Sequence, residues 1–553
     1  MRTNVLIAAA WPYANGSLHL GHISALIGAD VLARYNRLVG NNVLFVSGSD
    51  CHGTPIVVEA DRLGVKPSSI ALKYHKEFTR TLIRGLGFSY DLYTTTTTAN
   101  HVEVVQELFL KLYDDGQIYT KVDDLPHCPN CNRFLPDRLV EGECPHCHFR
   151  EARGDQCDEC GRLLNPEDLV KPKCKVCGDA PEWKPSEHFY LKLSAFQSFL
   201  EGWVGESEGW RPNADGFTEK FLAQGLHDRA ITRDTTWGVP IPIPGYDDKR
   251  IYVWFDAVCG YLSASKEWSV SKGQPELWRE WWEDDKAIHY YVHGKDNILF
   301  HTVIWPSILH GFGGLHLPDR IISSEYLTLE RKQFSKSRHW AVWLPDFIKD
   351  FDPETLRFYL VLAGPETADA DFTWSDFRLR VNSELIGKFG NFINRVLALV
   401  RKSFPEGVRY PSSLSTDQAE FVDHAGRCFE TVGSAIERGK FRVAFKEALS
   451  LAEHGNRYIN TVEPWESSKT DRNKAEGDLA VAVQVIRCLS ILVNPFLPVS
   501  SDKIQGQVGE GRVETWEQPV PRDIFAANEP RPLYRRVEQV EVDEQRSRLG
   551  KGG

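Results

Sequence analysis

Runs of apolar residues that end in short polar or glycine-containing loops recur through the first part of the chain. The run at 5–10 predicts a parallel strand covered on both faces, and a proline and an Asn-Gly pair end it. Ser17 is then a candidate N-cap for a helix whose first turn carries His19 and His22. We predict further strands at residues 42–46, 251–255, 288–292 and 320–329. Strands that alternate with helical stretches predict an α/β fold built on a parallel sheet.

The second part of the chain has helical periodicity instead. Residues 346–363 and 373–403 are helical by pattern. Three more amphipathic stretches follow, at 416–437, 440–462 and 475–494, and each is long enough to bury one apolar face against its neighbours. The pattern therefore predicts a helical bundle after the α/β part.

Composition narrows the class of protein. Hydrophobic residues make up 42% of the chain and charged residues 25%, and no apolar run approaches the roughly 18 residues of a membrane span, so we exclude a membrane protein. The net charge of −11 argues against a general nucleic-acid coat but is compatible with one local basic face. The apolar run after Arg2 resembles a secretion signal, but it leads directly into the proposed ligand loop, so we predict a cytoplasmic protein.

Cysteines are concentrated in one segment. Eight of the twelve lie between Cys128 and Cys177, in four Cys-x-x-Cys pairs. Two pairs make a thiolate cage for Zn²⁺, so the segment offers one or two structural zinc sites. The short gap between the second and third pairs favours one ion for the inner pairs and another for the outer pairs. Four disulfides are the alternative, which is less compatible with a chain without an export signal. The predicted ligands are Cys144, Cys147, Cys157 and Cys160 for the first ion and Cys128, Cys131, Cys174 and Cys177 for the second, with His127, His146 and His148 as less favoured substitutes.

Two histidines stand where the first strand meets its helix. A helix N-terminus is a ready-made phosphate site, and imidazoles there could donate hydrogen bonds to phosphoryl oxygens. A lone His-x-x-His pair is more often an ordinary surface feature. About three hundred residues later, however, the chain has the basic segment 331–338, Arg-Lys-Gln-Phe-Ser-Lys-Ser-Arg. Together the two segments resemble the His-Ile-Gly-His and Lys-Met-Ser-Lys-Ser signatures of class I aminoacyl-tRNA synthetases.

Other candidate ligand groups follow predicted strands, where ligands bind in open parallel sheets. Asp50 follows the strand at 42–46 and could meet a substrate ammonium, although a helix-capping aspartate is an equal alternative. The Gly-Lys-Asp loop at 294–296 opens a helix whose aromatic side lines either the core or a pocket. That side carries Phe300, His301 and Trp305.

With the Trp-Pro-Tyr at 11–13, the His-Gly-Thr-Pro at 52–55 and the Tyr-Val-Trp at 252–254, these segments resemble one branch of that class, the methionyl-tRNA synthetase family, from near residue 4 to about residue 500. The resemblance implies a methionine pocket formed by Trp11, Tyr13, Asp50, Trp254, Tyr261, Phe300, His301 and Trp305. An aromatic pocket suits a thioether, because sulfur packs favourably against ring edges.

The resemblance also implies the residues that handle the other substrates. ATP would be bound by Pro12, Tyr13, His19, Gly21, His22, Gly294, Asp296, Ser335, Lys336 and Ser337. Catalytic roles would fall to His19, His22 and Lys336. The anticodon of the tRNA would be read by Asn391, Arg395 and Trp465.

The implied architecture is a Rossmann-type parallel-sheet catalytic domain that is split by a zinc-knuckle connective insertion and followed by an α-helical anticodon-binding bundle. The expected catalytic halves are 1–118 and 251–326, on either side of the insertion at 119–250. The Ser-Lys-Ser loop and stem-contact region would span 327–381, and the bundle with its tail 382–553.

The implied activity is the ATP-dependent charging of tRNA(Met) with L-methionine. The expected partners are tRNA(Met), L-methionine and ATP with Mg²⁺, and we expect a monomer without membrane contact. Two alternatives stay open. One is a paralogue that activates another apolar amino acid or serves a specialised pathway. The other is a catalytically inactive, zinc-stabilised tRNA-binding protein, against which intact His19, His22 and Lys336 count.

Three positions depart from the family pattern. Gln333 and Phe334 stand where the signature has Lys and Met, so one mobile cation is lost, although Arg331 and Lys332 adjoin it. Trp11 stands where many members have Leu, and its bulk could narrow the pocket. These departures bear on the choice of amino acid more than on the type of reaction.

Overall fold

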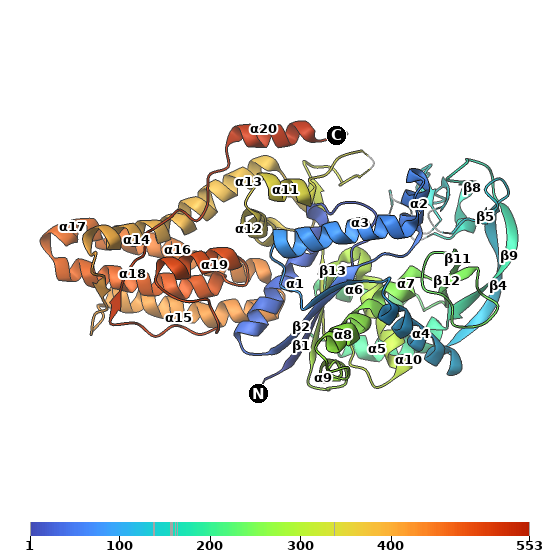
Figure 1. The fold of residues 1–553 in the computed structure, drawn as a ribbon, viewed down its shortest axis with the longest axis horizontal. Helices are drawn as coiled ribbons and strands as arrows, with labels where there is room; N and C mark the ends of the chain where they lie inside the picture. The colour runs from blue at the N-terminus through green and yellow to red at the C-terminus, as the bar shows by residue number, and fades with distance from the viewer. Residues whose placement is uncertain are drawn as a thin grey trace.

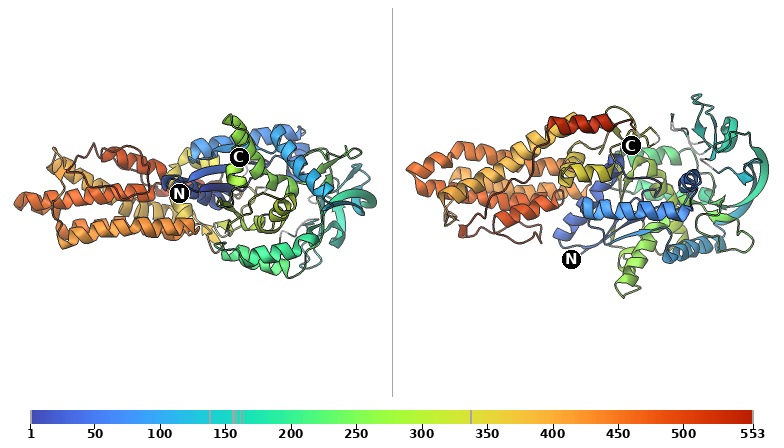
Figure 2. Two further views of the ribbon diagram at one scale, coloured as in Figure 1. Left: turned by 90° about the horizontal axis from the view of Figure 1, so that it is seen from below. Right: turned by 45° about the horizontal axis from the view of Figure 1, so that its top comes forward.

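The computed structural model describes residues 2–136, 139–154, 157, 159–160, 162, 164–336 and 338–551. The molecule is elongated, with a helical bundle at one end, a parallel sheet in the middle and a β-rich insertion at the other end (Figure 1). Two further views show the bundle and the insertion extending from opposite sides of the sheet (Figure 2). Within the described ranges, no helix is long and apolar enough to cross a membrane.

A five-stranded parallel sheet forms the centre, in the order β14-β13-β1-β2-β3. Val5 pairs with Val43 on one side and with Ile288 on the other, so strands from before and after the insertion lie next to each other. The predicted split α/β fold is therefore confirmed. The strands are β1 (Asn4–Ala9), β2 (Asn42–Ser49), β3 (Leu92–Thr95), β13 (Ile288–Gly294) and β14 (Arg320–Ser324).

Helices cover this sheet, and the first of them also joins it to the bundle. α1 is buried along most of its length, and its Asp30 forms a buried ion pair at 2.7 Å with Arg357 of α12 (Pro353–Ala363). The helices of the catalytic part are α1 (Leu20–Leu38), α2 (Thr54–Leu63), α3 (Pro67–Thr79), η1 (Arg80–Gly85), α4 (Ala99–Asp114), α8 (Gly260–Ser271), α9 (Arg279–Trp282), η6 (Lys295–Asn297), η7 (Phe300–Ile304) and α10 (Trp305–Phe312).

The predicted strand at 251–255 is wrong. Only β12 (Lys249–Ile251) is extended, and the next residues form α7 (Val253–Asp256) and η5 (Ala257–Cys259). The β-branched and aromatic side chains favour a strand locally. The helical turn prevails because it buries Val253, Phe255 and Asp256 in the core.

Two other predicted boundaries also differ. The stretch 320–329 forms two strands, because only β14 joins the main sheet while β15 (Leu327–Leu329) pairs with β16 (Ala370–Phe372). The first helix begins at Leu20, with His19 rather than Ser17 at the N-cap position. The His22 Nδ1 atom accepts the His19 backbone N–H at 3.1 Å, which satisfies that group in place of a serine cap.

The insertion is built on a long antiparallel pair, β4 (Ile118–Cys128) and β9 (Glu182–Leu191). A second, smaller sheet, of β6, β7 and β8, lies beside it. Cysteines of both predicted zinc sites lie in or next to the strands of this smaller sheet. The other elements of the insertion are β5 (Arg133–Phe134), β6 (Val140–Glu143), β7 (Ala152–Arg153), η3 (Pro166–Asp168), β8 (Val170–Cys174), η4 (Leu193–Phe196), α5 (Gln197–Gly205), α6 (Pro212–Leu222), β10 (Arg229–Ala230) and β11 (Thr232–Asp234).

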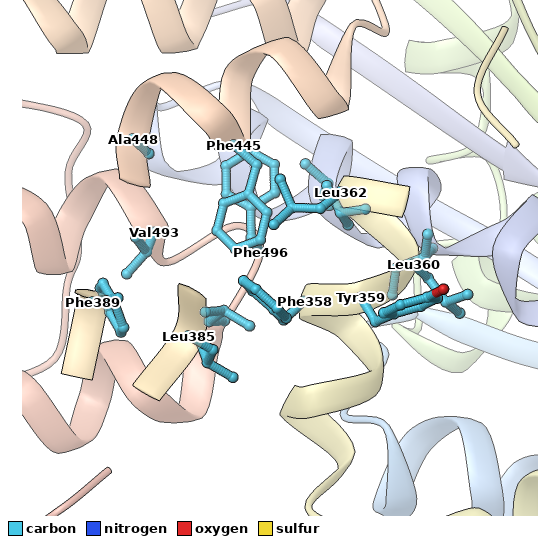
Figure 3. Packing of buried hydrophobic residues seen from close by; sticks show 14 of the residues in the cluster. Phe358, Tyr359, Leu360, Leu362, Leu385, Phe389, Phe445, Ala448, Val493 and Phe496 are labelled. Carbon is cyan, nitrogen blue, oxygen red and sulfur yellow. The ribbon is translucent and has the colours of Figure 1, made fainter. Parts of the chain in front are cut away.

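The helical bundle and the catalytic part share one hydrophobic core. Phe358 of α12 faces Phe445 of α16 (Phe441–Val462), with ring centroids 6.0 Å apart, and Phe445 stacks on Phe496 at 4.5 Å (Figure 3). Truncating such a ring typically costs about 3–5 kcal/mol. This packing fixes the bundle against the sheet.

The predicted bundle is confirmed, although the first predicted helices are interrupted. The stretch 346–363 divides where Pro353 starts a new helix, and the stretch 373–403 contains a π-helical segment. The elements of this part are α11 (Leu344–Asp350), α12 (Pro353–Ala363), α13 (Trp374–Arg380), η8 (Val381–Gly390), α14 (Asn391–Ser403), β17 (Val408–Arg409), α15 (Thr416–Glu437), α16 (Phe441–Val462), α17 (Pro464–Thr470), α18 (Arg472–Val493), α19 (Pro498–Gln507), β18 (Ile524–Phe525) and α20 (Gln539–Arg548).

Candidate active site

His19 and His22 lie together at the start of α1. Their ring centroids are 3.8 Å apart. Because the His22 Nδ1 atom accepts a backbone N–H, its proton is on Nε2, which is free to donate to a ligand. Burial, together with the charge of Lys336, lowers the pKa of His22 to about 3 and that of His19 well below its usual value. Both rings are therefore neutral hydrogen-bond donors at physiological pH.

The basic loop reaches the same place. The Lys336 ammonium donates to Asn15 Oδ1 at 3.1 Å, in the turn that leads into α1. A Cβ atom on Gly16 would lie 3.0 Å from Lys336 Nζ, so glycine leaves room for the lysine. Burial lowers the pKa of Lys336 to about 8. The structure thus brings the two signature segments together.

Phe334 binds the loop to the first signature. Its ring stacks on His19, with centroids 4.6 Å apart and an interplanar angle of 7°. A Cβ atom on Gly21 would lie 3.0 Å from the His19 ring and 3.5 Å from Phe334. Glycine at position 21 therefore permits this stack. Ser335 is half-buried and accepts hydrogen bonds from Arg338, while Ser337 lies outside the described residues.

The loop after the first strand pairs with the end of the second. The Asp50 N–H donates to the Pro12 carbonyl at 2.9 Å, and Tyr13 forms a parallel bridge with Asp50. The Asp50 side chain is only 2% exposed, and burial together with the charge of Asp256 raises its pKa well above its usual value. A cation bound nearby would reverse that shift, because it would stabilise the carboxylate.

Asp256 is the main buried ionic group of the site that sequence reasoning missed. Its carboxylate pairs with His52 Nδ1 at 2.7 Å and with His101 Nε2 at 2.5 Å, and despite burial these two partners lower its pKa to about 2. The only sequence signal was an acidic residue directly after an apolar run. No spacing rule connects residues 52, 101 and 256, so only the fold joins them.

Aromatic side chains line one side of this region. The Tyr261 hydroxyl donates to His301 Nε2 at 2.8 Å, since His301 Nδ1 bonds the Asn297 carbonyl at 2.8 Å. Burial lowers the pKa of His301 to about 4, so this ring is neutral. Trp254 and Phe300 pack edge to face with centroids 4.8 Å apart.

The two other tryptophans of the predicted methionine pocket, Trp11 and Trp305, lie in different surroundings. Trp11 fits between Gly48 and Gly260, where added Cβ atoms would lie 2.5 and 2.8 Å from its ring. Trp305 is fully buried and donates its indole N–H to the Tyr291 hydroxyl at 2.8 Å. Tyr291 in turn packs against Tyr261, so Trp305 lies one layer behind that side chain.

Gly294 is the last residue of β13 and Asp296 lies just beyond it, beside the end of β1. The two strands continue together to this point, since the Ala10 N–H donates to the Val292 carbonyl at 2.9 Å. Asp296 accepts a hydrogen bond from the Tyr326 hydroxyl. These groups share the sheet edge with Pro12 and Asp50, which is where ligands bind in such sheets.

The cysteines form two clusters that could hold metal ions. Within each cluster the four Sγ atoms lie within 4.8 Å of one another, and the pairing of inner with inner and outer with outer pairs is the predicted one. All eight are free thiols, with Sγ atoms such as those of Cys147 and Cys157 3.5 Å apart. Backbone N–H groups donate to Cys128 and Cys144 Sγ, which suits thiolate ligands. Among the residues that the structure describes, neither cluster includes a histidine.

The three predicted anticodon residues converge at the far end of the bundle. The Arg395 guanidinium lies 4.6 Å from the centre of the Trp465 ring and donates to Asn460 Oδ1 at 2.7 Å. Asn391 is one helical turn earlier and donates to Asn456 at 3.1 Å. Asn456 and Asn460 were missed from sequence, although their four-residue spacing on α16 matches that of the pair on α14.

A parallel sheet split by an insertion, with paired histidines and a lysine loop over one helix N-terminus, defines a class I aminoacyl-tRNA synthetase. The family model described as tRNA synthetases class I (M) matches residues 5–397, and that of the anticodon binding domain of methionyl tRNA ligase matches residues 408–549. The chain belongs to the methionine–tRNA ligase family. The resemblance seen in the sequence is thereby confirmed.

Individual relatives agree over the whole chain. The methionine–tRNA ligase of Bacillus cereus is 44% identical over 99% of both chains, and that of Dehalococcoides mccartyi is 45% identical over 100% of both. A crystal structure of Mycobacterium tuberculosis methionyl-tRNA synthetase bound by methionyl-adenylate has a TM-score of 0.80 at 24% identity, covering 97% of this chain and 100% of that one. That likeness shows the fold.

Proposed function

We propose that this chain, an ATP-dependent aminoacyl-tRNA synthetase, activates L-methionine to methionyl-adenylate and transfers the methionyl group to the 3′-terminal adenosine of tRNA(Met). In the first step a methionine carboxylate oxygen attacks the α-phosphorus of ATP, and pyrophosphate leaves. In the second, a ribose hydroxyl attacks the adenylate carbonyl, and AMP leaves. One observation carries the proposal: Lys336 contacts Asn15 in the turn that leads to His19 and His22.

The amino-acid choice is tested by pyrophosphate exchange with a panel of amino acids. We expect exchange with methionine and little with leucine, isoleucine or valine. Exchange with another apolar amino acid but not methionine would favour the specialised paralogue. No exchange at all, with tRNA binding intact, would favour the inactive tRNA-binding protein, a reading that the close packing of His19, His22 and Lys336 disfavours.

Positioning and charge stabilisation would do the catalytic work, since this reaction needs no protein nucleophile. The Nε2 donor of His22 and the neutral ring of His19 would bond phosphoryl oxygens, with Pro12, Tyr13, Gly21, Gly294, Asp296, Ser335 and Ser337 around the nucleotide. Lys336 would neutralise charge that develops on the leaving pyrophosphate. Mg²⁺ arriving with ATP would supply further charge neutralisation.

Methionine would bind between the Asp50 carboxylate and the aromatic wall. Asp50 would receive the ammonium, and the thioether would pack on Trp11, Tyr13, Trp254, Tyr261, Phe300 and His301, with Trp305 behind them. Tyr261 and His301 bond each other, which satisfies the polar atoms of that pair. A pocket of this kind suits the polarizable sulfur.

We propose that Asn391, Arg395 and Trp465 read the anticodon. Replacing Trp465 by alanine should weaken tRNA binding by about 1–3 kcal/mol, or roughly 5- to 150-fold, because a base loses its stacking partner. Filter binding measures the loss, and methionine-dependent pyrophosphate exchange without tRNA should be unchanged. Tyr113→Ala, which truncates an exposed ring on α4, is the matched control. Equal affinities for the two variants would contradict the assignment.

We propose two structural zinc ions, one in each cysteine cluster. Protein purified without added zinc should contain two ions per chain by metal analysis, and Cys144→Ser should leave one. Loss of that ion should loosen the insertion locally, because the cysteines are part of its small core and structural zinc contributes on the order of 10 kcal/mol to folding such modules. One ion per wild-type chain would contradict the second site.

We also propose the domain limits expected from the sequence, with catalytic halves at 1–118 and 251–326 around an insertion at 119–250, a stem-contact region at 327–381 and a bundle from 382.

A charging enzyme acts where its tRNA is used, so we place it in the cytoplasm. We propose that it works as a monomer, because His19, Lys336 and Asp50 all come from one chain.

A further inference from the structure

The end of the chain contacts the basic loop at two points. Arg546 of α20 forms an ion pair and hydrogen bond with Glu330 at 3.1 Å. Four residues later, the Gly550 N–H donates to the His339 carbonyl at 3.1 Å. Figure 1 shows α20 lying above α13 and α11, with the C-terminus at the side of the loop that follows β15. We call residues 539–550 the tail.

Both residues that the tail contacts, Glu330 and His339, lie in turns with unfavourable backbone torsion angles. Glu330, Arg331 and His339 have φ angles of 48°, 64° and 51°, in the left-handed region that side chains disfavour. Glu330 and Arg331 lie in a first turn, closed by backbone hydrogen bonds between Leu329 and Lys332, and His339 lies in a second, closed by backbone hydrogen bonds between Ser335 and Trp340. Such conformations persist only where surrounding contacts hold them. The tail supplies a contact to each turn.

The second turn contains Lys336. Its ends are paired, since the Ser335 N–H donates to the Trp340 carbonyl at 2.9 Å and the Trp340 N–H returns the bond. The Trp340 indole N–H donates to the Leu329 carbonyl at 2.9 Å, which joins the second turn to the first. A shift of either turn would therefore move Lys336 away from Asn15.

The tail itself is anchored to the body of the protein independently of the loop. Arg548 pairs with Asp350 of α11 at 2.6 Å, and Gln545 donates to the same carboxylate at 2.6 Å. Val542 is fully buried. The tail is thus fixed to the body of the protein. Along the chain, it follows the helical bundle that carries Trp465.

We propose that the tail is a positioning element of the active site, in which Arg546 and the Gly550 N–H hold the catalytic loop so that Lys336 reaches the triphosphate. The proposal deepens the function proposed above for Lys336. Arg546 itself touches no substrate, and it acts through Glu330. Adenylate formation therefore depends on α20, a helix that is far from Lys336 in the sequence.

The test compares Arg546→Ala with Gln539→Ala in the full chain. Arg546→Ala should lower kcat for pyrophosphate exchange about two- to fivefold, the range expected for a partly exposed ion pair, with the methionine KM unchanged. Trypsin cleavage at Arg331, Lys332, Lys336 and Arg338 should become several-fold faster. Gln539→Ala removes a hydrogen bond to Asp543 within the same helix but neither an anchor of the tail nor a loop contact, so it should change neither quantity. Arg546→Lys should restore part of kcat.

Equal kcat and equal trypsin cleavage for Arg546→Ala and wild type would overturn the proposal, as would equal effects of the two alanine variants. Deleting residues 538–553 should reduce kcat further than Arg546→Ala, while wild-type activity after the deletion would also overturn it. Trypsin cleavage does not depend on the amino acid that is activated. It therefore separates failure of this proposal from failure of the proposed function.

Discussion

Replacing Lys336 by alanine is expected to lower the rate of methionine-dependent pyrophosphate exchange by about 10²- to 10³-fold, the usual effect of removing one preorganised charge-stabilising group. The side chain reaches Asn15 beside the paired histidines, and it is buried enough that its pKa falls to about 8. Water would replace the lost ammonium poorly in such a site. The affinity for tRNA should remain close to wild type, because the residues proposed to read the anticodon are at the far end of the bundle.

The pH dependence of kcat/KM for ATP identifies the group responsible. This parameter reports the free enzyme, in which Lys336 is charged below pH 8 and loses its proton above it. The wild-type value should therefore fall above about pH 8. In Lys336→Arg that basic limb should disappear, because a guanidinium stays protonated. An unchanged exchange rate in Lys336→Ala, or a persisting limb in Lys336→Arg, would refute the assigned role.

Asp50→Asn should raise the KM for methionine by roughly 10²- to 10³-fold, since removing one partner of a buried ion pair costs about 3–5 kcal/mol. In the free protein the burial of Asp50 and the charge of Asp256 already favour its neutral form. An asparagine of the same shape should therefore leave the melting temperature without methionine unchanged. Added methionine should raise the Tm of wild type but not that of Asp50→Asn.

Asp215→Asn is the matched control, because burial also raises the pKa of that carboxyl but it lies on α6 of the insertion. Its methionine KM should equal that of wild type. If Asp50→Asn binds methionine as tightly as this control, another group must receive the ammonium.

Local sequence was informative wherever chemistry depends on near neighbours. The apolar run at 5–10 becomes β1, and the Cys-x-x-Cys spacing yields the two observed clusters. The long amphipathic stretches at 416–437 and 440–462 match α15 and α16 almost residue for residue. In each case the deciding forces act over a few residues, through periodic burial or ligand spacing.

Errors arose where a distant contact outweighed local preference. β-Forming residues after Ile251 fold as α7, because that turn lets Asp256 meet His52 and His101. Ser17 is a good cap by type, but the ring of His22 satisfies the His19 N–H instead.

By itself, the sequence determined the class of fold, a parallel α/β part followed by a helical bundle, together with the two signature segments and the metal-ligand pairs, because these are encoded in short-range patterns. Only the tertiary structure decided that Phe334 stacks on His19, that the charge of Asp256 raises the pKa of Asp50 and that Arg546 pairs with Glu330. Those pairs are separated by some two hundred residues or more along the chain. Their proximity follows from how sheet, insertion and bundle pack, which no local pattern records.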